Sequence, residues 1–498
     1  MMSKLQSDYN FIEKFKFMAE SYPDFTAYEE EGTDIKYTYR ECLRQIEVWK
    51  GYFAALDIKS GDKILIFLAE EIEFIFSFYA LASTGVISAF YDTKATDYEL
   101  NQIIEQFDPD GIVTSSKHFA RRDQLLYNPG LRFVMTTDSF DDIRTDSIFE
   151  KIIFSDLPRS PIPLEAPERD TIISCHFTYK GFGYPLQVRH TYHEYALFLE
   201  QACTIYPQEP GSVNLIGLPF YPIYGISTSV VFPLSNGSKM LVCKDLPKKN
   251  ILSLLANNDV TLVCLVPLLL KKLANEAALD NEGHKDKLDP RLEIISGGSY
   301  LNEGLQKAIY KSLGLKVYQG YGLTETFPIT FNHKKKVCFG TIGSPISEYT
   351  TISIVNYDGM LLPTGEVGEI MIKGKTIAEG YYGKKAETEN FFQQGGIYTG
   401  DLGYLDQDGF LHFVGRKYPF TKVTSKMVDL SEIEQAVTNY SGVIEARAIV
   451  RENDKFGELV YLYVKVERQK QITEKDLKSH CRTFLSRHKV PSKIYVVN

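Results

Sequence analysis

The sequence predicts an α/β fold with more than one domain, and two observations support this prediction. Segments that read as strands alternate with segments of helical spacing, as in residues 63–67, 73–84 and 85–90. Such alternation is typical of parallel sheets flanked by helices. The chain has 498 residues, 44% of them hydrophobic, which is enough for two or more hydrophobic cores.

The elements of the first half follow from spacing and capping signals. Apolar residues recur at helical spacing within residues 8–22. Thr38 and Glu41 form a capping box that starts the next helix, and the proline-rich residues 155–170 read as a surface connector. Further elements are expected at 63–67 (strand), 73–84 (helix), 85–90 (strand), 171–178 (strand), 250–257 (helix), 260–265 (strand) and 267–277 (helix).

The last part of the chain reads as a small module of helices and strands. Ser431 and Glu434 have the spacing of a capping box, with Ser431 as the N-cap of a helix. Strands are expected at residues 444–450 and 459–466, followed by a helix at 474–485.

Composition excludes several classes of partner and site. The net charge is −9 and no long run has a single sign, which gives no support for nucleic-acid binding. The seven cysteines have no Cys-x-x-Cys spacing, so structural zinc is not expected and a reducing compartment fits best. No apolar stretch is long enough to span a bilayer or to act as a signal peptide, and we expect a cytoplasmic protein without a membrane span.

The segment from Tyr318 to Thr326 combines two glycines with a hydroxyl and a carboxylate. Gly320 and Gly322 let the backbone turn and approach a ligand closely. Thr324 can offer a hydroxyl to a phosphate, and Glu325 can offer an oxygen to Mg²⁺. The alternative is a strand-to-loop turn with two solvated polar residues.

Residues 320–325 resemble the Tyr-Gly-x-Thr-Glu motif of the adenylate-forming superfamily, which includes acyl-CoA synthetases, adenylation domains of nonribosomal peptide synthetases and luciferases. Residues 294–301, 365–370 and 398–403 resemble further blocks of that superfamily in its own order. The resemblance implies a large N-terminal domain of mixed and parallel sheets flanked by helices, at residues 1–416. It also implies a small α+β lid domain at residues 417–498, with the hinge near Tyr418 and Pro419.

The resemblance also implies roles for individual residues. Thr324 and Glu325 are the expected catalytic residues, and Glu325 is the expected Mg²⁺ ligand. The expected nucleotide-binding residues are Gly297, Gly298, Tyr321, Gly322, Thr324, Asp401 and Arg416, with Asp401 and Arg416 at the ribose. The expected acyl pocket contains Tyr221, Pro222, Gly298 and Gly320, and Pro222 replaces a histidine of the superfamily.

The loop that grips phosphates in the superfamily is altered here. The segment reads Thr178, Tyr179, Lys180, Gly181, Phe182 and Gly183, where relatives have Thr-Ser-Gly-Thr-Thr-Gly. Three small hydroxyl residues are lost, Leu186 replaces a lysine, and Lys180 offers a charge only from a different backbone position. Because hydrogen bonds to charged groups contribute roughly 1.5–3 kcal/mol each, a loss of about 4 kcal/mol would weaken ATP binding about a thousandfold. The alternative is that this loop is now only a connector.

Two more departures concern the lid. Ser425 replaces a glycine that lines the pantetheine tunnel in relatives. Relatives also continue past the segment around Lys493 to a Gly-Lys pair that carries the catalytic lysine, whereas the sequence ends at Asn498. Either the sequence is trimmed before that lysine or the protein lacks it. Lys489 or Lys493 would substitute for it only in a different lid pose.

Three hypotheses about function therefore stay open. The first is a ligase that uses ATP and Mg²⁺ to activate a small carboxylic acid as acyl-AMP and passes it to the pantetheine thiol of CoA or a carrier protein. The second is an ATP-independent enzyme acting on acyl thioesters by hydrolysis, transfer or condensation. The third is a non-catalytic nucleotide- or acyl-binding module. Cys175 and His176 lie on opposite faces of a strand, so they are not expected to act as a pair.

Overall fold

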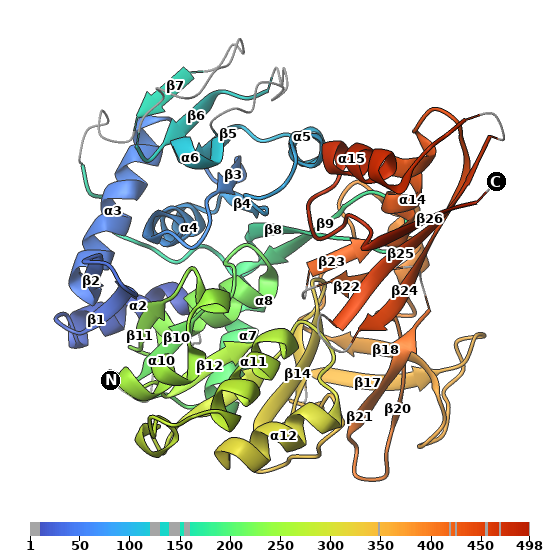
Figure 1. Ribbon diagram of the computed structural model, residues 1–498. Coiled ribbons are helices and arrows are strands. Elements are labelled where there is room, and N and C mark those ends of the chain that lie inside the picture. Colours follow the sequence, from blue (N-terminus) through green and yellow to red (C-terminus); the bar gives the residue numbers. More distant parts are fainter. Residues whose placement is uncertain are drawn as a thin grey trace.

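The computed structural model shows a large body built on two sheets and a smaller C-terminal part (Figure 1). It describes residues 10–119, 130–138, 150–153, 160–346, 349–417, 420–423, 426–453, 457–467 and 470–497.

The first large sheet has seven strands in the order β7-β6-β5-β3-β4-β8-β9. All neighbours are parallel except β8 and β9, which form an antiparallel hairpin. The loop at residues 179–185 joins these two strands, so it lies at the end of the sheet. The strands are β3 (Lys63–Phe67), β4 (Ile87–Phe90), β5 (Gly111–Thr114), β6 (Phe133–Thr136), β7 (Glu150–Ile153), β8 (Ile172–Thr178) and β9 (Leu186–Thr191).

The second large sheet has nine strands in the order β16-β15-β14-β13-β12-β10-β11-β1-β2. Its six central strands, from β14 to β1, are parallel to their neighbours, and β2, β15 and β16 at the two edges are antiparallel. The strands are β1 (Thr26–Glu30), β2 (Lys36–Thr38), β10 (Val213–Ile216), β11 (Lys239–Val242), β12 (Leu262–Leu265), β13 (Glu293–Ser296), β14 (Val317–Leu323), β15 (Phe327–Phe331) and β16 (Ser344–Pro345).

A layer of helices lies between the two sheets and forms the largest hydrophobic core. Ile64 and Ile66 of β3 point into this core, as do Met240 and Val242 of β11, since alternate strand residues share one face. The helices of the large body are α2 (Phe11–Ser21), α3 (Tyr39–Ala55), α4 (Ile72–Thr84), α5 (Asp97–Phe107), α6 (Ser116–Phe119), α7 (Tyr192–Ile205), α8 (Ile223–Ile226), α9 (Phe232–Ser235), α10 (Ile251–Asn257), α11 (Pro267–Ala278), α12 (Glu303–Leu313) and α13 (Lys385–Phe391).

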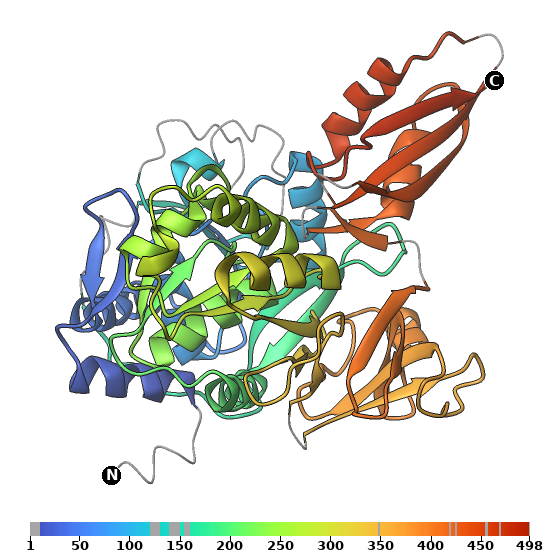
Figure 2. The ribbon, with the colours of Figure 1, turned by 60° about the horizontal axis from the view of Figure 1, so that its bottom comes forward.

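A third sheet and the C-terminal domain complete the fold. Figure 2 shows the C-terminal elements, in red, standing out from the body beside the orange third sheet. We call the part from β22 onward the C-terminal domain. The third sheet contains β17 (Thr350–Val355), β18 (Gly368–Gly374), β19 (Phe392–Gln393), β20 (Gly396–Leu405) and β21 (Leu411–Arg416), and the C-terminal domain contains β22 (Phe420–Val423), β23 (Lys426–Asp429), α14 (Leu430–Thr438), β24 (Val443–Asn453), β25 (Gly457–Val466), α15 (Glu474–Phe484) and β26 (Lys493–Val497).

The predicted α/β fold with a small α+β C-terminal domain is confirmed. The division after Arg416 stays a prediction, because Tyr418 and Pro419 lie outside the described residues, as does Ser425. Of the described helices, none is both long and apolar enough to cross a membrane.

Two local predictions were wrong. Gly320 and Gly322 do not turn the chain, because both lie within β14, which runs to Leu323 and pairs with β15. They permit close packing instead, since a Cβ on Gly320 would lie 2.2 Å from the ring of Phe331.

The helix of the C-terminal domain begins earlier than its predicted N-cap. Asp429, not Ser431, is the N-cap of α14, and its Oδ1 accepts the backbone N–H of Ser431 at 2.8 Å. Asp429 and Glu432 have the same spacing as Ser431 and Glu434, so both fitted the capping pattern. The apolar Leu430 decides between them, because it is buried in the first turn.

Candidate functional site

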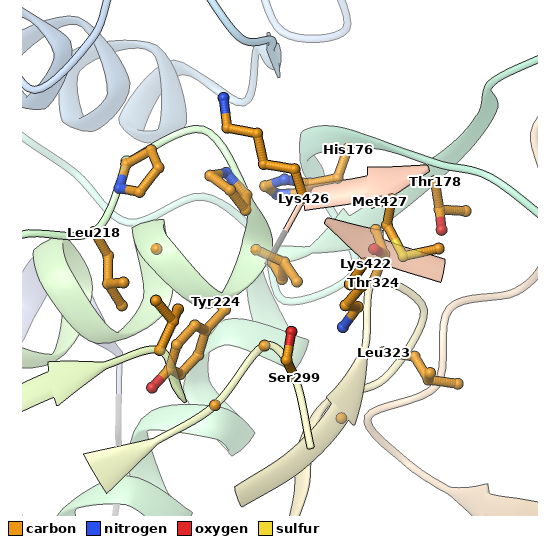
Figure 3. A pocket seen from close by; sticks show the side chains of 18 of the residues that line it. His176, Thr178, Leu218, Tyr224, Ser299, Leu323, Thr324, Lys422, Lys426 and Met427 are labelled. Atoms are coloured by element: carbon orange, nitrogen blue, oxygen red, sulfur yellow. The ribbon is translucent and has the colours of Figure 1, made fainter. Parts of the chain in front are cut away.

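A cavity of about 490 Å³ lies where the two large sheets, the third sheet and the C-terminal domain meet. The carboxyl ends of β13 and β14 and the loop after β8 open into it, which is where ligands bind in parallel sheets. Figure 3 shows Lys422, Lys426 and Met427, carried by the β22–β23 hairpin, on one side of the pocket. Leu218 and Tyr224 lie on the other side in the same view.

One wall of the cavity is apolar and aromatic. Pro222 caps the short helix α8, which places Tyr224 over the turn that follows β13. Gly297 lies against this ring, and a Cβ there would be 2.5 Å from Tyr224 Cζ. The space beside Gly297 is therefore filled by a ring of the chain itself. Tyr221 donates its hydroxyl to Asp92 at 3.3 Å, and both residues line the cavity.

A second wall carries polar groups without partners. Tyr321 donates a hydrogen bond to Asp401 Oδ2 at 2.8 Å, and this contact raises the pKa of the tyrosine in addition to the effect of burial. Asp401 Oδ1 lies 3.3 Å from Arg416 Nε, but no hydrogen bond forms between them. Both atoms are buried without another partner among the described residues. These two atoms form an ion pair but no hydrogen bond. They suit a pair of hydroxyl groups on a ligand, because buried polar groups are costly without a hydrogen bond.

Thr324 and Glu325 follow directly after β14 at the junction of these walls. The carbonyl of Thr324 is fixed by His190 Nε2 at 2.7 Å. The Glu325 side chain is 1% exposed, and its Oε1 accepts the hydroxyl of Tyr381 at 2.7 Å. The same oxygen lies 3.1 Å from Nζ of Lys180, whose side chain is 2% exposed. Lys180 has therefore folded inward onto the predicted metal ligand.

The Glu325 carboxylate does not fit Mg²⁺ in this arrangement. Its negative charge is already balanced by the Lys180 ammonium, although Oε2 has no hydrogen-bond partner among the described residues. A divalent ion about 4 Å from an ammonium would be repelled by about 8 kcal/mol at an effective dielectric constant of about 20. The described part of the chain also holds no group of three or more His, Cys, Asp or Glu side chains placed for a metal.

The altered loop forms an anion cradle that is already occupied. Gly181 and Gly183 have φ of +86° and +82°, and their backbone N–H groups point toward one acceptor, as in anion-binding nests. Both N–H groups donate to Oδ2 of Asp429, at 3.0 Å each. Asp429 is fully buried, and burial raises the pKa of its carboxyl. The C-terminal domain thus inserts a carboxylate where the loop is built to hold an anion.

A buried network of charges joins the two domains beside the loop. Lys489 Nζ lies 2.7 Å from Glu99 of α5 and 2.9 Å from Glu432 of α14, and it donates to the hydroxyl of Tyr179 at 3.3 Å. Burial raises the pKa of Glu432 to about 7, while the ammonium of Lys489, acting against burial, lowers the pKa of Glu99. One cation therefore balances one ionised carboxylate, and the second carboxyl, with a pKa of about 7, is about half protonated at neutral pH.

Lys422 brings a further positive charge to the cavity from β22. No ion-pair partner of its Nζ occurs among the described residues. Burial, followed by the nearby Arg416 and Lys180, lowers the pKa of Lys422 to about 8. Its neighbour on the hairpin, Lys426, is instead paired with Asp92 of the large body.

Cys175 and His176 lie on opposite faces of β8, as predicted. Cys175 packs into the core on one side of the sheet, and burial raises its pKa to about 12. His176 lies 3.2 Å from the hydroxyl of Tyr195 on the other side. The two side chains cannot act together.

The structure brings most of the predicted site residues to this one cavity. Gly181, Phe182 and Gly183 do not line it, because the loop turns toward α14 at that point. The predicted residues that line it are Thr178, Tyr179, Lys180, Tyr221, Pro222, Gly297, Gly298, Gly320, Tyr321, Gly322, Thr324, Glu325, Asp401 and Arg416.

Three contributors were missed in the sequence. Tyr381 lies 56 positions from Glu325, so no spacing signal linked them. Lys422 follows a predicted hinge and gave no pattern of its own. Asp429 precedes Glu432 by three residues, as the N-cap of a helix does. That spacing could have predicted the start of the helix, but not the contact of Asp429 with the loop.

Comparisons with known proteins agree with this geometry. The sequence profile described as AMP-binding enzyme matches residues 15–382, and that described as AMP-binding enzyme C-terminal domain matches residues 432–498. A 2-succinylbenzoate–CoA ligase of Oceanobacillus iheyensis is 26% identical over 486 residues, covering 96% of this chain and 93% of the relative. A long-chain-fatty-acid–CoA ligase of Mycobacterium tuberculosis is 24% identical, covering 95% and 91%.

Solved structures share the fold. The o-succinylbenzoate CoA synthetase of Bacillus subtilis, bound with a product analogue, has a TM-score of 0.82 at 22% identity and covers 97% of this chain and 94% of its own. The amide bond synthetase McbA of Marinactinospora thermotolerans has a TM-score of 0.84 at 19% identity, with 98% and 95% covered.

Proposed function

The chain belongs to the AMP-binding enzyme family. We propose that it is an acid–thiol ligase, which binds the acyl-adenylate of a carboxylic acid and transfers the acyl group to the pantetheine thiol of CoA. This corresponds to the acyl-adenylate and thiol-transfer steps of the first of the three hypotheses. The curated relatives named above are CoA ligases, which favours CoA over a carrier protein as the thiol.

The observation that carries the proposal is the ion pair of Asp401 Oδ1 and Arg416 Nε, two buried atoms without a hydrogen bond among the described residues. A ribose offers two neighbouring hydroxyl groups, and one can donate to the carboxylate while the other accepts from the guanidinium. Tyr321 holds the other oxygen of Asp401, so the carboxylate is oriented before a nucleotide binds. The nucleoside end of an adenylate fits this wall.

The acyl end fits the apolar wall formed by Leu218, Ile223 and Tyr224. Such a lining suits an uncharged aromatic or aliphatic acyl group, because a charged group would lose its hydration there without a partner. Gly298 and Gly320 lie at the junction of the two walls, where the acyl carbon meets the phosphate.

The chemistry needs little from the protein beyond positioning. The thiol sulfur forms a bond to the acyl carbon, the bond from that carbon to the phosphate oxygen breaks, and AMP leaves with the electron pair. The thiol proton passes to solvent. The ammonium of Lys422, which has no ion-pair partner among the described residues, offers a positive charge to the phosphate as negative charge develops on it.

A direct test measures thioester formation from CoA and synthetic adenylates of a panel of aromatic and aliphatic acids. We expect turnover with the wild-type chain, and a rate at least a hundredfold lower with Asp401→Ala, which loses the ribose contact. The acidic Asp406 lies just after β20, in the turn that leads to β21, and Asp406→Ala is the control. AMP binding without turnover on any adenylate would instead establish the binding-module hypothesis.

A further inference from the structure

The proposed function leaves one part of the site unexplained: the charges that the chain places beside its own nucleotide wall. Lys180 donates to the carbonyl of Thr399 at 3.4 Å, and Thr399 lies two residues before Asp401 on β20. The cradle of Gly181 and Gly183 follows Lys180 directly. The Lys180 ammonium therefore lies on the same side of the cavity as Asp401, and the cradle adjoins it along the loop, just outside the cavity lining.

Both positions are filled by the chain itself. The cation position on Glu325 holds the ammonium of Lys180. The anion cradle holds the carboxylate of Asp429. Both N–H donors of the cradle are used by Asp429, and α14 packs closely on the loop, since a Cβ on Gly183 would lie 2.3 Å from the side chain of Gln435.

We infer that Lys180 and Asp429 set the nucleotide specificity of the site: in the domain arrangement of this structure, it takes a nucleoside monophosphate or an acyl-adenylate and excludes the triphosphate. The terminal phosphates and their divalent cation would need the positions that Asp429 and Lys180 occupy. The inference rests on the proposed function. It adds that the site binds the nucleotide as a monophosphate or an adenylate and not as a triphosphate.

A consequence follows for the reaction sequence. The substrate that enters this arrangement is an acyl-adenylate, so a reaction that joins a carboxylic acid to an adenylyl group must come before it. The same chain can carry out that reaction only when the C-terminal domain withdraws Asp429 from the cradle.

The test is a calorimetric titration of the full chain with AMP, ATP and inorganic pyrophosphate, each with Mg²⁺ and with a chelator. Wild-type protein should bind AMP equally well with and without Mg²⁺. It should bind ATP at least about tenfold more weakly than AMP, because two charge-assisted hydrogen bonds must be given up. ATP binding as tight as AMP binding, or pyrophosphate competing with AMP, would overturn the inference.

Asp429→Asn is the informative variant. Its Oδ1 still caps α14, but its amide nitrogen cannot accept from the two N–H groups of the cradle. The ratio of ATP to AMP affinity should rise at least about tenfold. Asp476→Asn makes the same charge change at the start of α15 and should keep the wild-type ratio. Asp429→Ser, which also caps well but is too short to reach the cradle, serves if Asp429→Asn does not fold. An unchanged ratio in either variant at Asp429 would overturn the inference.

Lys180→Met tests the cation position independently of nucleotides. With the ammonium gone, Mg²⁺ should raise the unfolding temperature of the variant and leave that of wild type unchanged. A rise in wild type as well would overturn the inference. The adenylate assay separates the two proposals: selective AMP binding without thioester formation removes the proposed function alone, and thioester formation without selectivity removes this inference alone.

Discussion

The buried ion pair between Lys180 and Glu325 makes a strong prediction about stability. The side chains are 2% and 1% exposed, and Nζ lies 3.1 Å from Oε1. Lys180→Met keeps the length of the side chain and removes its charge. Among the described residues, the variant leaves the Glu325 side chain with one hydrogen bond, from Tyr381. Removing one partner of a buried ion pair costs about 3–5 kcal/mol, so we expect that loss in the free energy of unfolding.

Urea unfolding at neutral pH, without divalent ions, measures this loss. Lys385→Met is the control, because Lys385 pairs with Glu389 at 3.7 Å on the surface, where the side chains are 90% and 67% exposed. An exposed pair of this kind contributes about 0.5 kcal/mol or less.

The double variant Lys180→Met, Glu325→Gln completes the cycle, because it leaves no buried charge behind. It should recover to within about 1–2 kcal/mol of wild type. The reasoning is refuted if Lys180→Met lowers the free energy of unfolding no more than Lys385→Met does. It is also refuted if the loss in the double variant equals the sum of the losses in Lys180→Met and Glu325→Gln.

Three further predictions concern pH and the cavity. Burial raises the pKa of Glu432 from 4.5 to about 7, so the folded chain holds a proton that the unfolded chain has lost between these values. Stability should therefore fall by about 3 kcal/mol as pH rises through this window, and Glu432→Gln should flatten the profile of unfolding free energy against pH. Gly297→Ala should displace Tyr224 toward the apolar wall, because the new Cβ would lie 2.5 Å from the ring. The free energy of unfolding should fall by about 1–3 kcal/mol, and KM for the adenylate should rise. An unchanged KM would argue against the placement of the acyl group. AMP affinity should fall as pH rises through about 8, where Lys422 loses its proton. Lys422→Met should bind AMP weakly at every pH between 7 and 9. If the affinity of this variant still falls with pH, another group titrates.

Much of the fold could be predicted because local signals and tertiary packing agree. Thr38 caps α3 in the predicted capping box, and β3 spans the predicted residues. The glycines of β14 misled because the sequence alone does not distinguish a glycine needed for a positive φ from one needed for close packing. At position 320 a glycine is needed because the ring of Phe331 packs against it. The ring lies there because β14 pairs with β15.

The candidate site was predictable as a set of residues but not as a set of contacts. Asp401, Arg416 and Thr324 follow motifs, so their positions could be inferred from the resemblance. The partner of Lys180 could not, because Glu325 is 145 positions away and a lysine at that position departs from the family's loop. Asp429 belongs to another domain, and its contact with the loop depends on how the domains sit.

The tethering of Asp429 links nucleotide binding to the position of the C-terminal domain. A carboxylate held on the same chain competes with a phosphate at an effective concentration that is often millimolar. Linkage is reciprocal. If docking of the C-terminal domain lowers the affinity for a ligand that needs the cradle, binding of that ligand must lower the docking equilibrium of the domain by the same factor. High concentrations of pyrophosphate should then expose the interface around Lys489, and hydrogen exchange at the backbone of Gly181 and Gly183 should report it. AMP should leave that exchange unchanged, because it makes no demand on the cradle. Equal protection under both ligands would mean that Asp429 and the phosphate do not compete, and that the loop binds its anion elsewhere.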